Sequence, residues 1–160
     1  MYKRPVSVLV VIHTPDLQML LLERVLHPGY WQSVTGSLET GETPAEAALR
    51  EVAEETGIIV PPQQFRDWQQ CWEYEIFPEW RDRYAPGVTR NTEHVFSLQL
   101  PARVEIRLAP DEHRAFCWLP AKEAATRCFS PSNQRAILTL PEILRGTMPQ
   151  QTENSLPPEA

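Results

Sequence analysis

The segment that most constrains the fold of this 160-residue chain is residues 43–57, which carry both the start and the stop signal of a helix. Thr43 is a favourable N-cap residue, Pro44 suits the first helical position, and Glu46 completes a capping box. Gly57 can end the helix because glycine adopts the left-handed conformation at no steric cost. The apolar residues between these signals recur at helical spacing and predict the buried face: Ala45, Ala48, Leu49 and Val52.

A second face of this helix is acidic. Glu51, Glu54 and Glu55 follow one another at spacings of three and four residues, so their side chains lie side by side and repel by about 0.2–0.5 kcal/mol per pair. Such a cluster fits a solvated helix face, and it equally fits a divalent-cation site, because Mg²⁺ prefers carboxylate oxygens and substrate phosphates. Arg50 and Glu42 flank the cluster and are placed to orient it.

Outside this helix the sequence alternates strand patterns with turn residues. Residues 5–12 and 18–24 are rich in β-formers and enclose a turn, which predicts a hairpin. A second long helix starts near Ser132 and runs towards Leu144. Further strands are predicted at residues 30–35, 58–60, 65–77, 93–100 and 115–119. This order predicts an α+β domain over residues 1–145, followed by a polar, Pro-rich, disordered tail over residues 146–160.

Charge and apolar runs exclude several classes of protein. The formal net charge of −6 argues against a protein that grips a nucleic-acid polymer, which needs a basic surface. The longest apolar run, Val8–Ile12, is far shorter than the ~20 residues of a membrane-spanning helix. The N-terminus lacks the apolar stretch of a signal peptide, and the three cysteines form no C-x-x-C pair. We therefore expect a cytoplasmic protein with no membrane partner; the oligomeric state stays open.

The helix belongs to a longer motif. Gly36, Glu42 and the run Arg50-Glu51-Val52-Ala53-Glu54-Glu55-Thr56-Gly57-Ile58 are separated by five and seven residues. In these residues and spacings the chain resembles the Nudix hydrolase family. The resemblance implies an α/β/α sandwich with a mixed central sheet. It also implies hydrolysis of a phosphoanhydride with Mg²⁺ or Mn²⁺ as cofactor.

The same resemblance implies roles for individual carboxylates. Glu51 and Glu55 would be metal ligands, with Glu54 close by and acting in catalysis together with Glu51. In this family a further acidic group often comes from outside the motif. We expect Glu112 to be that group, as an additional metal ligand or as the base that takes a proton from water. The alternative for Glu112 is an ordinary solvated loop residue.

An aromatic-rich segment, residues 65–84, suggests a binding pocket for a flat ring. Strand alternation places Tyr74 and Ile76 on one face and Glu75 and Phe77 on the other. Core packing explains these rings equally well. In the functional interpretation the rings stack on a heterocycle, and Glu75 accepts the two parallel N–H donors of a 2-amino-4-oxo ring. Pterin and guanine share that edge, so the pattern does not separate them.

Three stretches outside the motif, residues 2–5, 31–37 and 83–93, resemble a Nudix subgroup that acts on dihydroneopterin triphosphate. That subgroup forms dihydroneopterin monophosphate and pyrophosphate, in folate synthesis. The likeness implies a small-molecule triphosphate partner and the following substrate contacts: Lys3, Arg24, Thr35, Tyr74, Glu75, Ile76, Phe77 and Ser130. Two alternatives remain: a nucleoside triphosphate pyrophosphohydrolase acting on dATP, dGTP or oxidised purine nucleotides, and a Nudix-fold sensor without turnover.

Overall fold

The chain forms a mixed β-sheet with helices on both faces. The computed structural model describes residues 1–146 and 155–159. Its elements, in chain order, are β1 (Val6–His13), β2 (Gln18–Arg24), β3 (Trp31–Gln32), β4 (Val34–Ser37), α1 (Pro44–Thr56), the 3₁₀ helix η1 (Pro62–Gln64), β5 (Phe65–Ile76), the 3₁₀ helix η2 (Pro78–Arg83), β6 (Arg90–Gln99), β7 (His113–Pro120), α2 (Ala121–Arg127), α3 (Pro131–Leu144) and β8 (Ser155–Glu159).

Strand β1 lies at the centre of the sheet. It pairs in parallel with β6 along its whole length, from Val6 opposite Thr92 to His13 opposite Gln99. It also pairs antiparallel with β4 and, at its end, with β2, while β5 pairs antiparallel with β6 and β7 with β2. Because β1 is covered on both faces, its apolar residues form one continuous buried run rather than an alternating pattern.

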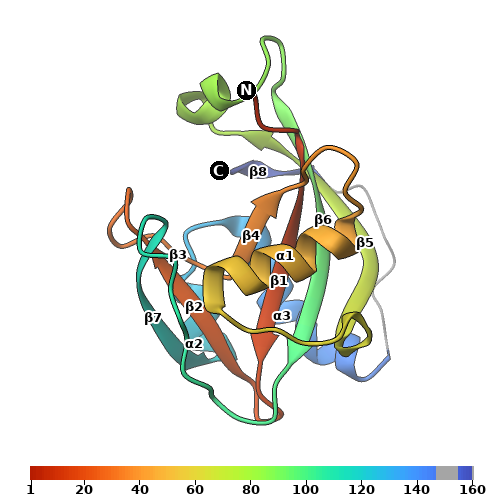
Figure 1. Cartoon of the computed structure of the whole chain (residues 1–160), viewed down its shortest axis with the longest axis vertical. Coiled ribbons are helices and arrows are strands. Elements are labelled where there is room, and N and C mark those ends of the chain that lie inside the picture. Colours follow the sequence, from red (N-terminus) through yellow and green to blue (C-terminus); the bar gives the residue numbers. More distant parts are fainter. Residues whose placement is uncertain (147–154, 160) are drawn as a thin grey trace.

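The two faces of the sheet carry separate hydrophobic cores. Helix α1 covers one face, where Ala47, Ala48 and Val52 pack against residues such as Val10 and Phe96. Helices α2 and α3 lie on the opposite face (Figure 1), and Ile137 there belongs to the core that includes Trp68, Trp72 and Val95. The structure is thus the α/β/α sandwich with a mixed sheet that the sequence predicts.

Helix α1 begins and ends as its sequence predicts. The Thr43 hydroxyl accepts a hydrogen bond from the Glu46 amide (3.2 Å), and the Glu46 carboxylate accepts one from the Thr43 amide (3.0 Å). Gly57 has φ 75°, the left-handed conformation, and its amide donates to the Ala53 carbonyl. Within the described part of the chain, no helix is both long and apolar enough to span a membrane.

The structure differs from the sequence-based expectation in four places. Of the residues predicted to form the buried face of α1, Ala48 and Val52 are buried, but Ala45 is exposed and Leu49 is half-buried, because the helix packs on the sheet through Ala47 instead.

The predicted strand at 58–60 is absent; Ile58 and Val60 pack on the α1-side core without a strand partner, so burial alone explains their apolar character. Helix α2 was not expected. Residues 155–159 of the tail predicted as disordered form β8, beside the outer strand β5, whose edge offers unpaired backbone groups. The rest of that tail, residues 147–154 and 160, lies outside the described residues.

Candidate active site

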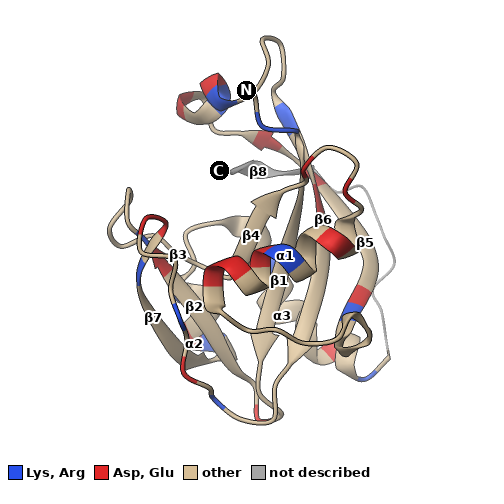
Figure 2. Ribbon diagram, viewed as in Figure 1, with Lys and Arg blue, Asp and Glu red and all other residues tan. Residues whose placement is uncertain are grey.

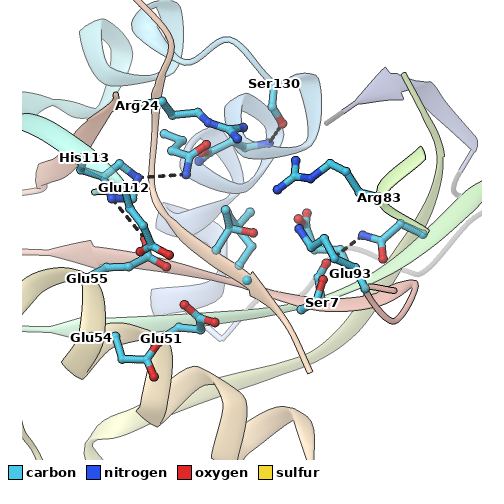
Figure 3. A pocket seen from close by; sticks show the side chains of 18 of the residues that line it. Ser7, Arg24, Glu51, Glu54, Glu55, Arg83, Glu93, Glu112, His113 and Ser130 are labelled. Atoms are coloured by element: carbon cyan, nitrogen blue, oxygen red, sulfur yellow. Dashed lines mark hydrogen bonds and ion pairs between the residues drawn. The ribbon is translucent and has the colours of Figure 1, made fainter. Parts of the chain in front are cut away.

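Helix α1 presents its acidic face to a cavity at the end of β4. The side chains of Glu51 and Glu55 are buried, whereas that of Glu54 is about half exposed (53%). Figure 3 shows these carboxylates gathered on one side of the pocket, together with Glu112. Buried carboxylates at helical spacing repel one another, so a solvated acidic face does not explain their arrangement.

Arg50 forms hydrogen bonds with several carboxylates at one side of this cluster. Its guanidinium donates two hydrogen bonds to the Glu42 carboxylate, at 2.7 and 2.9 Å, and one to the Ser37 carbonyl at 3.1 Å. It also contacts Glu51 at 2.7 Å and Glu54 at 3.3 Å. Figure 2 shows this single basic position between acidic ones along α1. The sequence predicts this orienting role, and the paired geometry restricts the Glu51 and Glu54 rotamers.

Gly36 leaves the space that the Glu51 side chain occupies. A Cβ atom added at Gly36 would overlap the carboxylate carbon and one carboxylate oxygen of Glu51. The close approach of this backbone to Glu51 therefore requires glycine, because any other residue would displace the carboxylate. The glycine at the start of the sequence motif thus has a direct steric cause.

Glu112 reaches the cluster from the loop before β7. The Val25 amide donates a hydrogen bond to the Glu112 carbonyl (2.9 Å) and so joins this loop to the end of β2. Burial, and then the charges of Glu51, Asp111 and Glu54, raise the pKa of Glu112. Burial, and then the proximity of Glu51 and Glu112, raise the pKa of Glu55 well above its ordinary value. Glu112, for which an ordinary solvated loop residue was the alternative, is exposed but lines the same cavity as the motif carboxylates.

His113 lies beside Glu55 without forming an ion pair at neutral pH. Its Nδ1 is 3.9 Å from Glu55 Oε1, beyond hydrogen-bonding distance. Burial, and then the charge of Arg24, lower the pKa of His113 to about 4, so the imidazole is neutral at pH 7. Its Nε2 lies 3.3 Å from Gln32 Nε2.

The carboxylates fit a divalent cation. Glu55 Oε1 is buried, has no hydrogen-bond partner among the described residues and lies 3.9 Å from His113 Nδ1. A divalent cation would satisfy this oxygen and offset the mutual repulsion. In the described residues no three His, Cys, Asp or Glu side chains already converge as a metal cage. Arg50 contacts Glu51 through Oε1, so ligation by the other carboxylate oxygen, Oε2, would leave that contact in place.

Three cations lie across the cavity from this cluster. Lys3 is brought there by a backbone hydrogen bond from its amide to the Arg83 carbonyl (2.9 Å). Burial, and then the charges of Arg83 and Arg24, lower the pKa of Lys3 to about 8. The Arg24 guanidinium lies 4.9 Å from the centre of the Trp80 ring. Three mutually repelling cations in one cavity indicate a site for a multiply charged anion.

Most of the predicted site residues line one cavity of about 480 Å³, a size typical of small-molecule sites (~300–1,000 Å³). Thr35 donates a hydrogen bond to the Val8 carbonyl, and Ser130 caps α3 by accepting one from the Asn133 amide. The predicted residues on the cavity wall are Lys3, Arg24, Thr35, Glu51, Glu54, Glu55, Tyr74, Glu112 and Ser130.

Three of the predicted substrate contacts do not line this cavity. The Glu75 side chain is exposed and opposite Arg90, on the face of β5 that points away from Tyr74. Ile76 is fully buried in a small core with Trp80, and Phe77 packs against that core. The prediction of Glu75 as the ring-pairing carboxylate is therefore wrong: strand alternation identifies its face correctly, but that face does not meet the cavity.

Sequence reasoning missed other cavity residues, which lie on β1, β3, η2, β6, β7 and α3. The most notable is Glu93, a buried carboxylate on β6 that is only 3% exposed. The signal was present, because a Glu among the buried residues of a central strand requires a polar partner. The further missed residues with polar side chains are Ser7, Gln32, Arg83, Asn91, His113 and Asn133.

Comparison with known proteins gives consistent matches. A family model described as the NUDIX domain matches residues 3–140. The chain is 52% identical over 139 residues to dihydroneopterin triphosphate diphosphatase of Escherichia coli, covering 85% of this chain and 91% of that protein. It is 41% identical to the protein of that name from Haemophilus influenzae, covering 85% and 87%. The solved structure of the E. coli dihydroneopterin triphosphate pyrophosphohydrolase superposes with a TM-score of 0.80 at 51% identity, covering 86% of this chain and 94% of the other.

Proposed function

The chain belongs to the NUDIX domain family, and from this premise we propose that it hydrolyses dihydroneopterin triphosphate to dihydroneopterin monophosphate and pyrophosphate. The observation that carries the proposal is one cavity with buried carboxylates on one wall and Lys3, Arg24 and Arg83 on the other. The relatives at 52% and 41% identity, named for the same substrate, support it. All the carboxylates of the motif are present, which argues against a sensor without turnover.

The cations of the cavity account for triphosphate binding. Lys3, Arg24 and Arg83 come from three separate segments and surround the space between α1 and η2. Their charges would compensate the phosphate oxygens and hold the chain of phosphates across the carboxylate cluster. This placement would bring the phosphates next to the carboxylates of α1, where the hydrolysis is proposed to occur.

The carboxylates account for the chemistry. We propose that Glu51, Glu55 and Glu112 hold Mg²⁺ or Mn²⁺, which when bound neutralises charge on the phosphoryl oxygens and activates water. Glu112, with a pKa raised by burial, is suited to take the proton from the attacking water, and the α1 carboxylates remain alternatives for that step. Arg50 keeps Glu51 and Glu54 oriented while this occurs.

The remaining expectations follow from this activity. The substrate is a small phosphorylated molecule, so no nucleic-acid polymer or membrane partner is required. An enzyme that acts on a soluble pterin metabolite would work in the cytoplasm.

The test is a comparison of kcat/KM for dihydroneopterin triphosphate, dGTP and dATP with Mg²⁺, with pyrophosphate and orthophosphate measured separately. We expect a preference of about a hundredfold for the pterin and release of pyrophosphate. Glu51→Gln is the matched control, because it removes one charge from the cluster at nearly constant volume.

Two results would overturn the proposal. A preference for dGTP or dATP would identify a nucleoside triphosphate pyrophosphohydrolase. Absence of turnover with all three compounds, in a protein that binds them, would identify a sensor.

A further inference from the structure

Glu93 is a buried carboxylate that the proposed hydrolysis does not use. It lies on β6, opposite Ser7 of β1 and Trp72 of β5, and its side chain points to the cavity wall remote from α1. Figure 3 shows it next to Ser7, across the pocket from the carboxylates of α1. Because Glu93 lies across the pocket from the α1 cluster, the presence of this buried carboxylate needs a separate explanation.

The local structure stabilises negative charge on Glu93. The Ser132 hydroxyl donates a hydrogen bond to Glu93 Oε1 at 3.0 Å. Ser132 lies in the first turn of α3, whose N-terminal amide groups carry partial positive charge. The Glu93 carboxylate thus lies at the positive end of the dipole of this 14-residue helix. Glu93 therefore provides hydrogen-bond acceptors to whatever occupies this end of the cavity.

Asn91 adds a second acceptor on the same face of β6. Residues two apart in a strand point to the same side, and both side chains are buried. The Asn91 amide nitrogen donates to Ser7 Oγ (2.8 Å) and to Tyr74 Oη (2.9 Å), which sets the orientation of the amide. Its Oδ1 is buried and has no hydrogen-bond partner among the described residues. An orphan acceptor in a binding cavity indicates a missing donor.

We infer that Glu93, with Asn91 Oδ1 beside it, recognises the N–H edge of a 2-amino-4-oxo ring and so determines the substrate's heterocycle. Such a ring presents its ring N–H and one amino N–H in parallel, which matches the two oxygens of a carboxylate. The second amino N–H points outward to the side, where Asn91 Oδ1 can accept it. This inference rests on the proposed function and assigns its ring-binding subsite.

The cavity wall near these acceptors suits a flat ring. Tyr74, Tyr84 and Phe129 line it and offer aromatic surface, while the acceptors lie at one edge. An adenine ring would place a ring nitrogen acceptor where the N–H of the 2-amino-4-oxo ring belongs. Two acceptors would then face each other in a desolvated site, which excludes adenine.

The test uses purine triphosphates that differ only at this edge. GTP has the complete edge, ITP lacks the 2-amino group, and ATP lacks both features. We expect wild-type kcat/KM to be about a hundredfold higher for GTP than for ITP. Glu93→Gln should lower kcat/KM for GTP and for dihydroneopterin triphosphate about a hundredfold, mainly through KM, and should reduce the GTP:ITP ratio below about five. The change for ATP should stay within about threefold.

Three further variants make the result specific. Glu73→Gln changes an exposed carboxylate of β5 and should leave all rates within about twofold. Glu75→Gln tests the carboxylate that strand alternation suggests. Ser132→Ala leaves Glu93 in place and removes its hydrogen bond; about a fivefold selective loss for GTP is expected. This variant keeps the test available if Glu93→Gln does not fold.

Equal losses for GTP, ITP and ATP in Glu93→Gln would overturn the inference, as would the selective loss appearing in Glu75→Gln instead. A wild-type protein that prefers GTP to dihydroneopterin triphosphate would refute the proposed substrate while leaving the GTP:ITP comparison valid. The two failures are therefore distinguishable.

Discussion

At the scale of single residues, the cavity holds titratable groups whose protonation differs from that of the same groups in water. Glu55 is fully buried and its pKa is raised, while the pKa of Lys3 is lowered to about 8. Desolvation is the largest cause for both, because it disfavours whichever form carries charge. A bound cation would restore the charged form of Glu55, and a bound phosphate chain would restore the charged form of Lys3. The charged form of each residue is therefore favoured when its ligand is bound.

Glu55→Gln should abolish activity without destabilising the fold. Glutamine has nearly the same volume and removes a carboxyl group that is buried against Glu51 and Glu112. We expect kcat at saturating Mg²⁺ to fall about a thousandfold, while the free energy of unfolding in the absence of metal does not decrease. Steady-state kinetics and urea unfolding measure the two quantities. The exposed Glu123→Gln serves as the control, and a Glu55→Gln rate near that of wild type would contradict the assignment.

Lys3 should limit activity at alkaline pH. Its pKa of about 8 means that the ammonium group loses its proton above pH 8 in the free enzyme, and kcat/KM reports the free enzyme. We expect kcat/KM to fall by about tenfold per pH unit above pH 8, since a neutral amine holds a triphosphate poorly. Tyr84 does not account for this limb, because burial raises its pKa.

Lys3→Arg should remove that decline, because the guanidinium stays charged throughout the measured range. The exposed Lys122→Arg is the matched control and should keep the wild-type profile. A decline above pH 8 that persists unchanged in Lys3→Arg would assign the ionisation to another group.

At the scale of secondary structure, α1 and β6 contribute differently to the site. The carboxylates of α1 are aligned by the helix itself, because residues 51, 54 and 55 share one face of any α-helix. Asn91 and Glu93 of strand β6 line the cavity only because β6 pairs with both β1 and β5. The positions of the α1 carboxylates therefore depend on where the helix begins and ends. The position of Glu93 depends instead on the register of the sheet.

Thr43→Ala should destabilise the protein modestly and leave its chemistry intact. The substitution removes the side-chain half of the capping box, which contributes about 1 kcal/mol, with a range of roughly 0.5–2. For a protein of this size we expect Tm to fall by about 2–4 °C, with kcat within about twofold of wild type. Glu46→Gln retains the reciprocal bond and should hardly shift Tm. A drop above about 10 °C in Thr43→Ala would mean that the cap supports more than the helix end.

At the scale of the whole molecule, the site joins segments that are distant in sequence, and its carboxylates oppose folding when no cation is bound. Folded-state pKa values of Glu55 and Glu112 lie above their ordinary value, so the folded protein binds more protons than the unfolded chain. Their contribution to stability is therefore present at low pH and is lost as pH rises from about 4.5 through the raised pKa values. His113, whose pKa is lowered to about 4, contributes in the opposite sense between about pH 4 and 6.5.

Mg²⁺ should raise Tm, and the increase should grow with pH. A cation that binds only the folded protein at a hundred times its Kd adds about 2.7 kcal/mol, or about 5–10 °C at this chain length. Protons compete with the cation for the same carboxylates, so the increase should be larger at pH 8 than at pH 5. Thermal unfolding with Mg²⁺ and with a chelator measures it. An increase in Glu55→Gln equal to that of wild type would place the cation elsewhere.

Local rules determine much of this protein. The cap at Thr43, the stop at Gly57 and the shared face of the α1 carboxylates depend on contacts within about four residues, so they can be predicted from sequence. The motif that contains Gly36 and Glu51 can also be recognised from the sequence. The reason for a glycine at position 36 appears only when β4 lies against α1, because the Glu51 side chain occupies the space of its missing Cβ atom.

Tertiary structure alone decided which carboxylate faces the ring end of the cavity. Alternation places Glu75 correctly on one face of β5, but which face meets the cavity depends on the pairing of Tyr74 with Asn91 and on the packing of α3. Lys3 reaches Arg83 and Tyr84 through a backbone contact across some eighty residues. Such long-range pairings depend on the whole sheet, because the free energy that selects them comes from burial shared among many strands rather than from any one segment.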